Sequence, residues 1–238
     1  MNVQLFIPCF VDQLYPNVGL NSVKILEKLG CTVSYNRGQT CCGQPAFNSG
    51  FMHECKSVSK KFIKDFKGDD YIVSPSGSCV GFVRNSFDTV FEGSRKLAKA
   101  QQVGKRAFEI TEFIVDILGV EDLGAKFDAQ ATYHDACGAL RECKIKEAPR
   151  KLLANVEGLR LTEMQESETC CGFGGTFAIK YDQISLGMAH TKVQSAVDIG
   201  ATHIISTDVS CLMHIDGFIE KQGIELKTAH IVDILASS

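Results

Sequence analysis

Short apolar runs alternate with stretches of helical periodicity along the first third of the chain. The predicted strands cover residues 4–9, 31–35 and 71–74, where β-branched and aromatic side chains cluster. The predicted helices cover residues 17–29, which end at Gly30, and 48–66, for which Asn48 and Ser49 are expected to act as caps. Alternation of strand and helix predicts a parallel α/β unit.

The same order of elements returns in the second half. Strands are predicted over residues 131–137, 159–162 and 203–206, and helices over 147–156 and 176–199. Residues 224–235 are expected to close this copy. Between the copies, residues 91–119 have a mostly helical pattern, and 119–129 are expected to form a linker.

Two pairs of similar short segments indicate a tandem duplication. Residues 74–79 (SPSGSC) match 206–211 (STDVSC), and residues 113–118 (FIVDIL) match 230–235 (HIVDIL). The repeating unit is therefore about 115 to 125 residues long, and the first copy is longer by about one helix. We predict two pseudo-symmetric tandem α/β domains, residues 1–120 and 121–238, each a mostly parallel sheet flanked by helices.

The duplication also repeats a pattern of four cysteines. Each copy has a Cys-Cys-Gly triplet, an upstream cysteine and a downstream cysteine. The first set is Cys9, Cys41, Cys42 and Cys79, and the second is Cys137, Cys170, Cys171 and Cys211. The upstream cysteines precede their triplets by 31 and 32 intervening residues, and the downstream cysteines follow by 35 and 38.

These eight cysteines are predicted to bind metal. They follow predicted strands, and the carboxyl ends of parallel strands meet at one edge of a sheet, where ligands bind. Structural zinc is the first alternative, but such sites usually use closely spaced cysteine pairs. Thiolate ligands of iron-sulfur clusters can be scattered through a fold. The other interpretation is that the cysteines are small core residues.

Several other residues are candidates near these sites. His134 stands where the first copy has Phe6, so it could contact a cluster or substrate, or be a structural histidine. Asp208 and Ser76 occupy matched positions three residues before the last cysteine, where they could ligate, hydrogen-bond or cap the loop. Cys31 and Cys55 are expected to be packing residues, and Cys143 is a weaker candidate for the second site.

The composition indicates a globular protein in a reducing compartment. The 238 residues are 45% apolar with a net charge of −3, and no long basic stripe favours nucleic acid or an anionic membrane. Apolar runs are far shorter than the roughly 20 residues of a transmembrane helix, and we expect a cytoplasmic protein without a signal peptide. An odd number of cysteines, 11, argues against a disulfide framework.

The cysteine motifs resemble those of a known family. Residues 41–46 (CCGQPA), 74–79, 170–176 (CCGFGGT) and 208–213 (DVSCLM) are similar to tandem cysteine-rich CCG-domain proteins. This module is also present in one component of heterodisulfide reductase, in one component of the anaerobic glycerol-3-phosphate dehydrogenase and in the iron-sulfur subunit of glycolate oxidase. Within the family, the match is strongest to members used in lactate utilization.

The resemblance implies an iron-sulfur subunit that oxidises L-lactate to pyruvate together with sister subunits. Fuller family members bind a noncubane cluster through five cysteines, but here Ser76 and Asp208 replace the extra cysteine. The simpler expectation is a 4Fe-4S cluster on each set of four thiolates, up to two per chain. The alternatives are a heterodisulfide-reductase-like or glycolate-oxidase-like subunit acting on another substrate, and a metal-stabilised scaffold without redox function.

Overall fold

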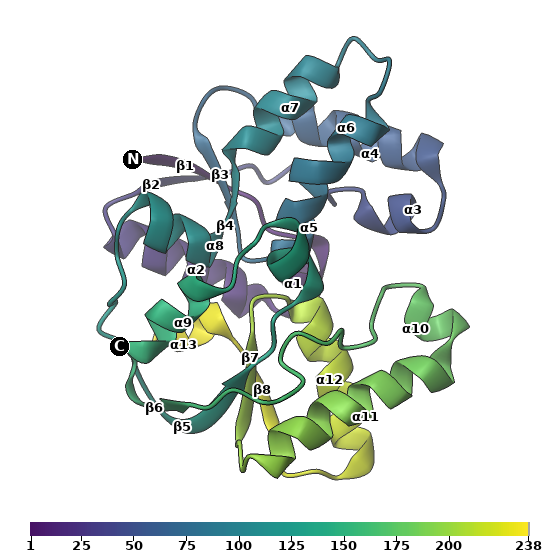
Figure 1. Cartoon of the computed structure of the whole chain (residues 1–238). Helices are drawn as coiled ribbons and strands as arrows, with labels where there is room; N and C mark the ends of the chain where they lie inside the picture. The colour runs from purple at the N-terminus through teal and green to yellow at the C-terminus, as the bar shows by residue number, and fades with distance from the viewer. Residues whose placement is uncertain (238) are drawn as a thin grey trace.

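The computed structural model describes residues 1–237, whose first half forms a four-stranded parallel sheet in the order β2-β1-β3-β4 (Figure 1). Its strands are β1 (Asn2–Leu5), β2 (Thr32–Tyr35), β3 (Tyr71–Ser74) and β4 (Ala107–Glu109). The central strands are apolar, and Val3, Leu5 and Val73 are at most 1% exposed. Such burial is typical of a parallel sheet that helices cover on both faces.

The helices of this half lie on either side of its sheet (Figure 1). They are α1 (Cys9–Leu14), α2 (Pro16–Lys28), α3 (Gln44–Asn48), α4 (Met52–Asp65), α5 (Gly77–Gly81), α6 (Phe87–Val90), α7 (Leu97–Arg106) and α8 (Ile110–Glu112). Two π-helical turns, η1 (Phe82–Ser86) and η2 (Phe113–Ile117), extend α5 and α8. Helix α2 begins with Pro16 at its first turn and ends just before Gly30, which has a φ of 79°.

The second half repeats this architecture, with a parallel sheet in the order β6-β5-β7-β8. Its strands are β5 (Lys126–Tyr133), β6 (Glu157–Leu161), β7 (His203–Ser206) and β8 (Lys227–His230). Its helices are η3 (Gly138–Glu142), α9 (Glu147–Ala154), α10 (Phe177–Lys180), α11 (Asp182–Asp198), α12 (Val209–Gln222) and α13 (Ile231–Leu235). The sequence prediction of two duplicated parallel α/β units is confirmed.

The strand register shows how the halves correspond. Ser74 pairs with Glu109 at the end of the first sheet, and Ser206 pairs with His230 at the end of the second. Glu109 and His230 are therefore equivalent positions. Helix α7 has no counterpart between α12 and β8, which confirms that the first copy is longer by about one helix.

Two predicted strands extend too far toward their cysteines. β1 ends at Leu5 rather than at residue 9, and β5 ends at Tyr133 rather than at residue 137. Pro8 ends the first run because it has no N–H for the ladder and, with a φ of −62°, stands at the start of α1. Cys9 therefore opens a helix instead of ending a strand.

The middle of the chain follows the prediction in part. Residues 91–119 are mostly helical as predicted, with α7, α8 and η2, but they also contain β4, a strand of only three residues, too short to show an alternation. The predicted linker at 119–129 includes the start of β5, because Lys126 already pairs with Glu157. The connection between the halves is therefore shorter than expected.

Two helix predictions also need correction. Asn48 belongs to α3, and α4 starts after Phe51 without a side-chain cap, so Asn48 and Ser49 do not cap it. The helix predicted over 176–199 is broken at Tyr181, where φ is −131° and ψ is 52°. The closing segment 224–235 consists of β8 followed by α13.

The halves share one core. Helices α2, α8, α9 and α13 lie between the two sheets (Figure 1), and a single cluster of buried apolar side chains runs through both halves. Polar contacts add to it, since Asn21 Nδ2 donates to Asp233 Oδ1 at 2.8 Å and Lys24 Nζ donates to the carbonyl of Ala236 at 2.8 Å. The duplicated units are therefore held in a fixed relation to each other.

Candidate metal centres

The four cysteines of the first half meet in one place, although they come from three different segments of the chain. Cys41 is hydrogen-bonded to Cys9 on one side and to Cys42 on the other. The thiol of Cys42 in turn donates to Cys79 Sγ at 3.6 Å. Cys9 opens α1 after β1, the triplet follows β2, and Cys79 lies in α5 after β3. We call these four residues the first thiol set.

The second half repeats this arrangement with Cys137, Cys170, Cys171 and Cys211, which we call the second thiol set. Cys170 is hydrogen-bonded to Cys137 and to Cys171, and Cys171 is also hydrogen-bonded to Cys211. The structure thus gathers all eight predicted ligands into two groups. Each group lies beyond the carboxyl ends of its parallel strands, where ligands of open α/β sheets bind.

Each set holds one cysteine that favours the thiolate. Hydrogen bonds from Cys42 and Cys9 lower the pKa of Cys41 to about 3. Hydrogen bonds from Cys137 and Cys171 lower the pKa of Cys170 to about 2. The thiolate is the form of cysteine that binds metals. All eleven cysteines are free thiols, so both sets are available as ligands.

The glycine of each triplet makes a turn that other residues would not allow. Gly43 and Gly172 have φ values of 106° and 95°. A Cβ on Gly172 would lie 2.6 Å from the carbonyl oxygen of Ser185. In this conformation the N–H groups of Gly43 and Gly172 donate to Cys41 Sγ and Cys170 Sγ, each at 3.4 Å. The turn therefore brings two adjacent thiols and one backbone donor to each site.

Residues next to the two thiol sets are in contact across the junction of the halves. A Cβ on Gly138 would lie 2.5 Å from the Cα of Ser78, so the residues next to Cys137 and Cys79 are in backbone contact. On another side, the rings of Phe10 and Phe173 pack edge to face with centroids 5.7 Å apart. Phe10 follows Cys9, and Phe173 follows the second triplet. Residues that flank the two sets therefore meet at two places.

Known proteins share both the motif and the whole chain. The model of the cysteine-rich CCG domain matches twice, at residues 3–84 and 131–216, and each match contains one triplet. This chain belongs to the CCG cysteine-rich domain family. It is 43% identical over 238 residues to "Lactate utilization protein A" of Geobacillus sp. and 43% identical to the protein of that name in Bacillus subtilis, covering 100% of each chain in both cases.

A solved structure supports the fold alone. A hypothetical protein from Helicobacter pylori aligns with 98% of this chain at a TM-score of 0.58 and 13% identity. Our chain matches 48% of that protein's length, so it spans about half of it. This similarity concerns the backbone fold only.

The candidates His134 and Asp208 are both buried, but they lie in different places: His134 beside the second thiol set and Asp208 at the junction of the halves. His134 is fully buried, and a ring nitrogen lies within 4.8 Å of the thiols of Cys171 and Cys211. Asp208 is also buried, but its carboxylate accepts hydrogen bonds from Ser76 Oγ at 2.6 Å and from the N–H of Ser78 at 2.9 Å. Asp208 therefore links the halves. Of the pair, only Ser76 caps its helix, by accepting from the N–H of Cys79.

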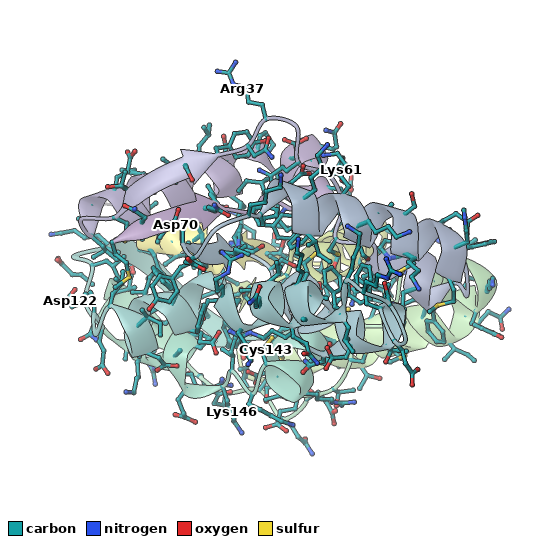
Figure 2. All side chains as sticks on the ribbon, turned by 90° about the horizontal axis from the view of Figure 1, so that it is seen from above. Arg37, Lys61, Asp70, Asp122, Cys143 and Lys146 are labelled. Carbon is teal, nitrogen blue, oxygen red and sulfur yellow. The ribbon has the colours of Figure 1, made fainter. Side chains whose placement is uncertain are left out.

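The three unmatched cysteines are buried in this CCG-family chain. Cys31 and Cys55 are 7% and 0% exposed, as expected for packing residues. The thiol of Cys143 donates to the carbonyl of Gly77 at 3.6 Å, on the first half. Burial raises the pKa of Cys143 to about 12, which disfavours its thiolate. Cys143 is 8% exposed and falls within the outline of the molecule in Figure 2, whereas Arg37 and Lys146 lie at opposite edges.

Sequence reasoning missed several charged residues. Lys192 is 1% exposed on α11, and Asp135, two residues before Cys137, is 2% exposed and paired with Arg150. Glu109 is fully buried, and burial raises its pKa to about 7. A charged residue inside an apolar helix pattern was the available signal for Lys192, but its partners are distant in sequence.

A basic groove lies away from both thiol sets. It has a volume of about 780 Å³ between α4 and α7. The basic side chains along it are Lys60, Lys61, Lys64, Lys67, Lys96, Lys99 and Arg106. The first four of these residues lie in one segment of the chain, and Lys96, Lys99 and Arg106 lie about 30 residues or more further along. The sequence therefore shows no continuous basic stripe. Among the helices of residues 1–237, none is long and apolar enough to cross a membrane.

Proposed function

We propose that this chain is the iron-sulfur subunit of a complex that oxidises L-lactate to pyruvate, and that it relays electrons between two clusters. The observation that carries the proposal is the pair of four-thiol sets, whose neighbouring residues Ser78 and Gly138 are in backbone contact across the junction. The substrate is proposed from the relatives named for lactate utilization. The two CCG units are assigned to residues 1–120 and 121–238.

The donor chemistry fits clusters. Each set has four cysteine sulfurs, the number that holds a 4Fe-4S cluster, and no short Cys-x2-Cys knuckle of the kind typical of structural zinc. The first cluster would be held by Cys9, Cys41, Cys42 and Cys79, and the second by Cys137, Cys170, Cys171 and Cys211. When bound, such clusters accept and donate one electron at a time.

The protein's own residues would set how each cluster behaves. The N–H groups of Gly43 and Gly172 donate to thiolate sulfur, which stabilises negative charge there. Cys42 and Cys171 are 1% and 2% exposed, so water is largely kept from these sulfurs. The contacts of Ser78 with Gly138 and of Phe10 with Phe173 would provide paths between the sets.

The relay requires partners. Oxidation of lactate to pyruvate releases two electrons and two protons, and the sequence has no flavin or nicotinamide motif. We therefore assign removal of hydrogen from lactate to a sister subunit, and assign to this chain the transfer of the two electrons, one after the other, to a further redox carrier.

The test is anaerobic purification of the full chain, with iron, sulfide and zinc analysis and electron paramagnetic resonance before and after dithionite. We expect about eight irons per chain and reducible signals, because each cluster of this type holds four irons. Zinc without sulfide under the same conditions would overturn the proposal. The lactate assignment is tested separately, by lactate-dependent reduction of the signals in the assembled complex.

A further inference from the structure

The two thiol sets are backed by different side chains at equivalent positions. Phe6 follows β1 and its N–H donates to the carbonyl of Val73 at 2.9 Å, while His134 follows β5 and its N–H donates to the carbonyl of Ile205 at 2.8 Å. Since β3 and β7 are equivalent strands, Phe6 and His134 are equivalent residues. An apolar ring in one half is thus an imidazole in the other.

A second difference between the halves lies on the equivalent helices α4 and α11. The carbonyl of Cys55 on α4 lies against Gly43, and the carbonyl of Ser185 on α11 lies against Gly172, so Cys55 and Ser185 correspond. Seven residues further along these helices stand Phe62 and Lys192. Phe6 and Phe62 pack edge to face at 4.9 Å in the first half. The second half replaces this aromatic pair with His134 and Lys192.

The imidazole of His134 is buried without a well-formed hydrogen bond. The residue is 0% exposed, and within residues 1–237 neither ring nitrogen makes a hydrogen bond of good geometry; the backbone of Ser167 makes only a weak one with the ring. Buried polar atoms in folded proteins are almost always paired, so an orphaned ring indicates a ligand. A ring nitrogen lies within 4.8 Å of both Cys171 Sγ and Cys211 Sγ, the direction in which the second cluster would lie.

Lys192 adds charge on the same side. It is buried, and its ammonium donates to the carbonyls of Glu166 and, at 3.1 Å, Ser167. These hydrogen bonds hold the group in place, within electrostatic range of Cys171 and Cys211. A fixed positive charge near a cluster stabilises its reduced form, which carries one more negative charge.

We propose that His134 contacts the metal centre of the second thiol set directly through an imidazole nitrogen, so that the two centres of this chain are chemically different. The first centre is bounded by the Phe6 and Phe62 rings and the second by His134 and Lys192. An N–H donor to a cluster sulfur and a nearby cation both favour reduction, and the donor role suits His134 because four cysteines already supply one thiolate to each iron. The second centre therefore has the higher reduction potential, and electrons pass from the first centre to the second.

The inference rests on the proposed function, since it assumes that the second set holds iron. The test uses the full chain, purified anaerobically after growth with ¹⁵N-histidine or with unlabelled histidine. Electron-nuclear double resonance is recorded on the reduced signals, which are assigned to a site with the Cys171→Ala variant. We expect a nitrogen coupling on the second-site signal that changes from ¹⁴N to ¹⁵N with the label and is absent from the first-site signal.

Variants then measure the consequence for the potential. His134→Phe, which reproduces the residue of the first half, should abolish the coupling and lower the midpoint potential of the second-site signal. Lys192→Met should lower that potential and keep the coupling. His190→Phe is the matched control, because His190 is exposed on α11 and should leave both readouts unchanged.

The outcomes separate the inference from the function. Iron and sulfide present in the wild-type chain, but no histidine coupling on the second-site signal, would overturn the role of His134 and leave the relay standing. A chain purified without iron and sulfide would overturn both. The labelling experiment needs no variant, so failure of His134→Phe to fold does not affect it.

Discussion

Ser76 Oγ donates to Asp208 Oδ1 at 2.6 Å, joining two residues that are 132 positions apart in the chain and equivalent in the two halves. Ser78 donates to the same carboxylate twice, from Oγ to Oδ1 at 2.7 Å and from its N–H to Oδ2 at 2.9 Å. The buried carboxylate of Asp208 therefore accepts three hydrogen bonds. Both equivalent residues stand three positions before a cysteine of a thiol set. The bond therefore fixes the spacing of the two sites as well as of the two halves.

Asp208→Ala should destabilise the chain by about 3 kcal/mol, because it leaves buried donors on Ser76 and Ser78 without an acceptor. The measurement is denaturant unfolding of the anaerobically purified chain. Asp69→Ala, which removes an exposed carboxylate in a loop, should leave the unfolding midpoint unchanged. Equal midpoints for the two variants would show that the bond contributes nothing to the junction.

Glu109 makes stability depend on pH. Burial raises its pKa from 4.5 to about 7, although hydrogen bonds from Thr111 and Thr207 oppose the shift. Between these values the folded chain keeps a proton that the unfolded chain releases, so stability falls as pH rises from about 4.5 to 7. The full loss above pH 7 is about 3 kcal/mol at most.

The Glu109→Gln variant tests this dependence, because the amide keeps the size of the side chain and cannot ionise. Unfolding free energies at pH 5, 6, 7 and 8 should fall less steeply with pH in this variant than in the wild type. Glu225→Gln, at an exposed position, should keep the wild-type slope. Identical slopes for Glu109→Gln and the wild type would contradict the assignment.

Arg150 neutralises a buried carboxylate beside the second thiol set. It donates to both oxygens of Asp135, at 2.9 and 2.7 Å. Burial alone would lower the pKa of Arg150, but its bonds to Asp135 and Glu163 outweigh it and raise that pKa. Arg150→Met should cost about 2 to 4 kcal/mol, because Asp135 is left as an unpaired buried charge.

The exposed pair of Lys146 with Glu168 provides the comparison for this prediction. Lys146→Met removes the same type of ion pair from the surface, where water screens it, and should not change thermal unfolding measurably. If Arg150→Met were as stable as Lys146→Met, the pair of Arg150 with Asp135 would have no structural role.

The grouping of the eight cysteines into two sets could be predicted from the sequence, because the duplication shows it directly. Cys41-Cys42-Gly43 and Cys170-Cys171-Gly172 repeat with partners at similar spacing, and strand ends bring such positions together whatever the details of packing. The role of Asp208 could not be predicted in this way. Its partner Ser76 becomes a neighbour only when one half packs on the other, and no periodicity within either half encodes that contact.

Short strands and buried polar residues also limited what could be predicted from the sequence. β4 has three residues, too few to show a period, and its last residue, Glu109, is charged. A buried carboxylate contradicts the usual pattern of strands, so the sequence predicts no strand there. The burial of Lys192 was equally hidden, since only the tertiary structure shows that its ammonium reaches the carbonyls of Glu166 and Ser167.

Removal of one thiol should empty one site only. Cys171→Ala takes the central ligand from the second set, so we expect iron and sulfide to fall to about half and the first-site resonance signal to remain. Lactate-dependent electron transfer by the complex should be lost. Cys31→Ala, at a buried cysteine outside both sets, should keep the full iron content. Loss of both signals in Cys171→Ala would indicate that the two sites depend on each other for assembly.

The close approach of the two cysteine loops depends on Gly138. A Cβ at this position would lie 2.5 Å from the Cα of Ser78, a backbone atom that cannot rotate away. Gly138→Ala should therefore push α5 and η3 apart and cost about 3 kcal/mol or more. Gly217→Ala is the matched substitution, because Gly217 lies within α12 with open space around it, and there alanine should stabilise the helix by about 0.5 to 1 kcal/mol. Denaturant unfolding of both variants should therefore give changes of opposite sign.

The same substitution should also affect electron transfer. Because Gly138 and Ser78 adjoin Cys137 and Cys79, the displacement should slow electron transfer between the sites in any Gly138→Ala chain that still folds. An unchanged rate would show that electrons take another route.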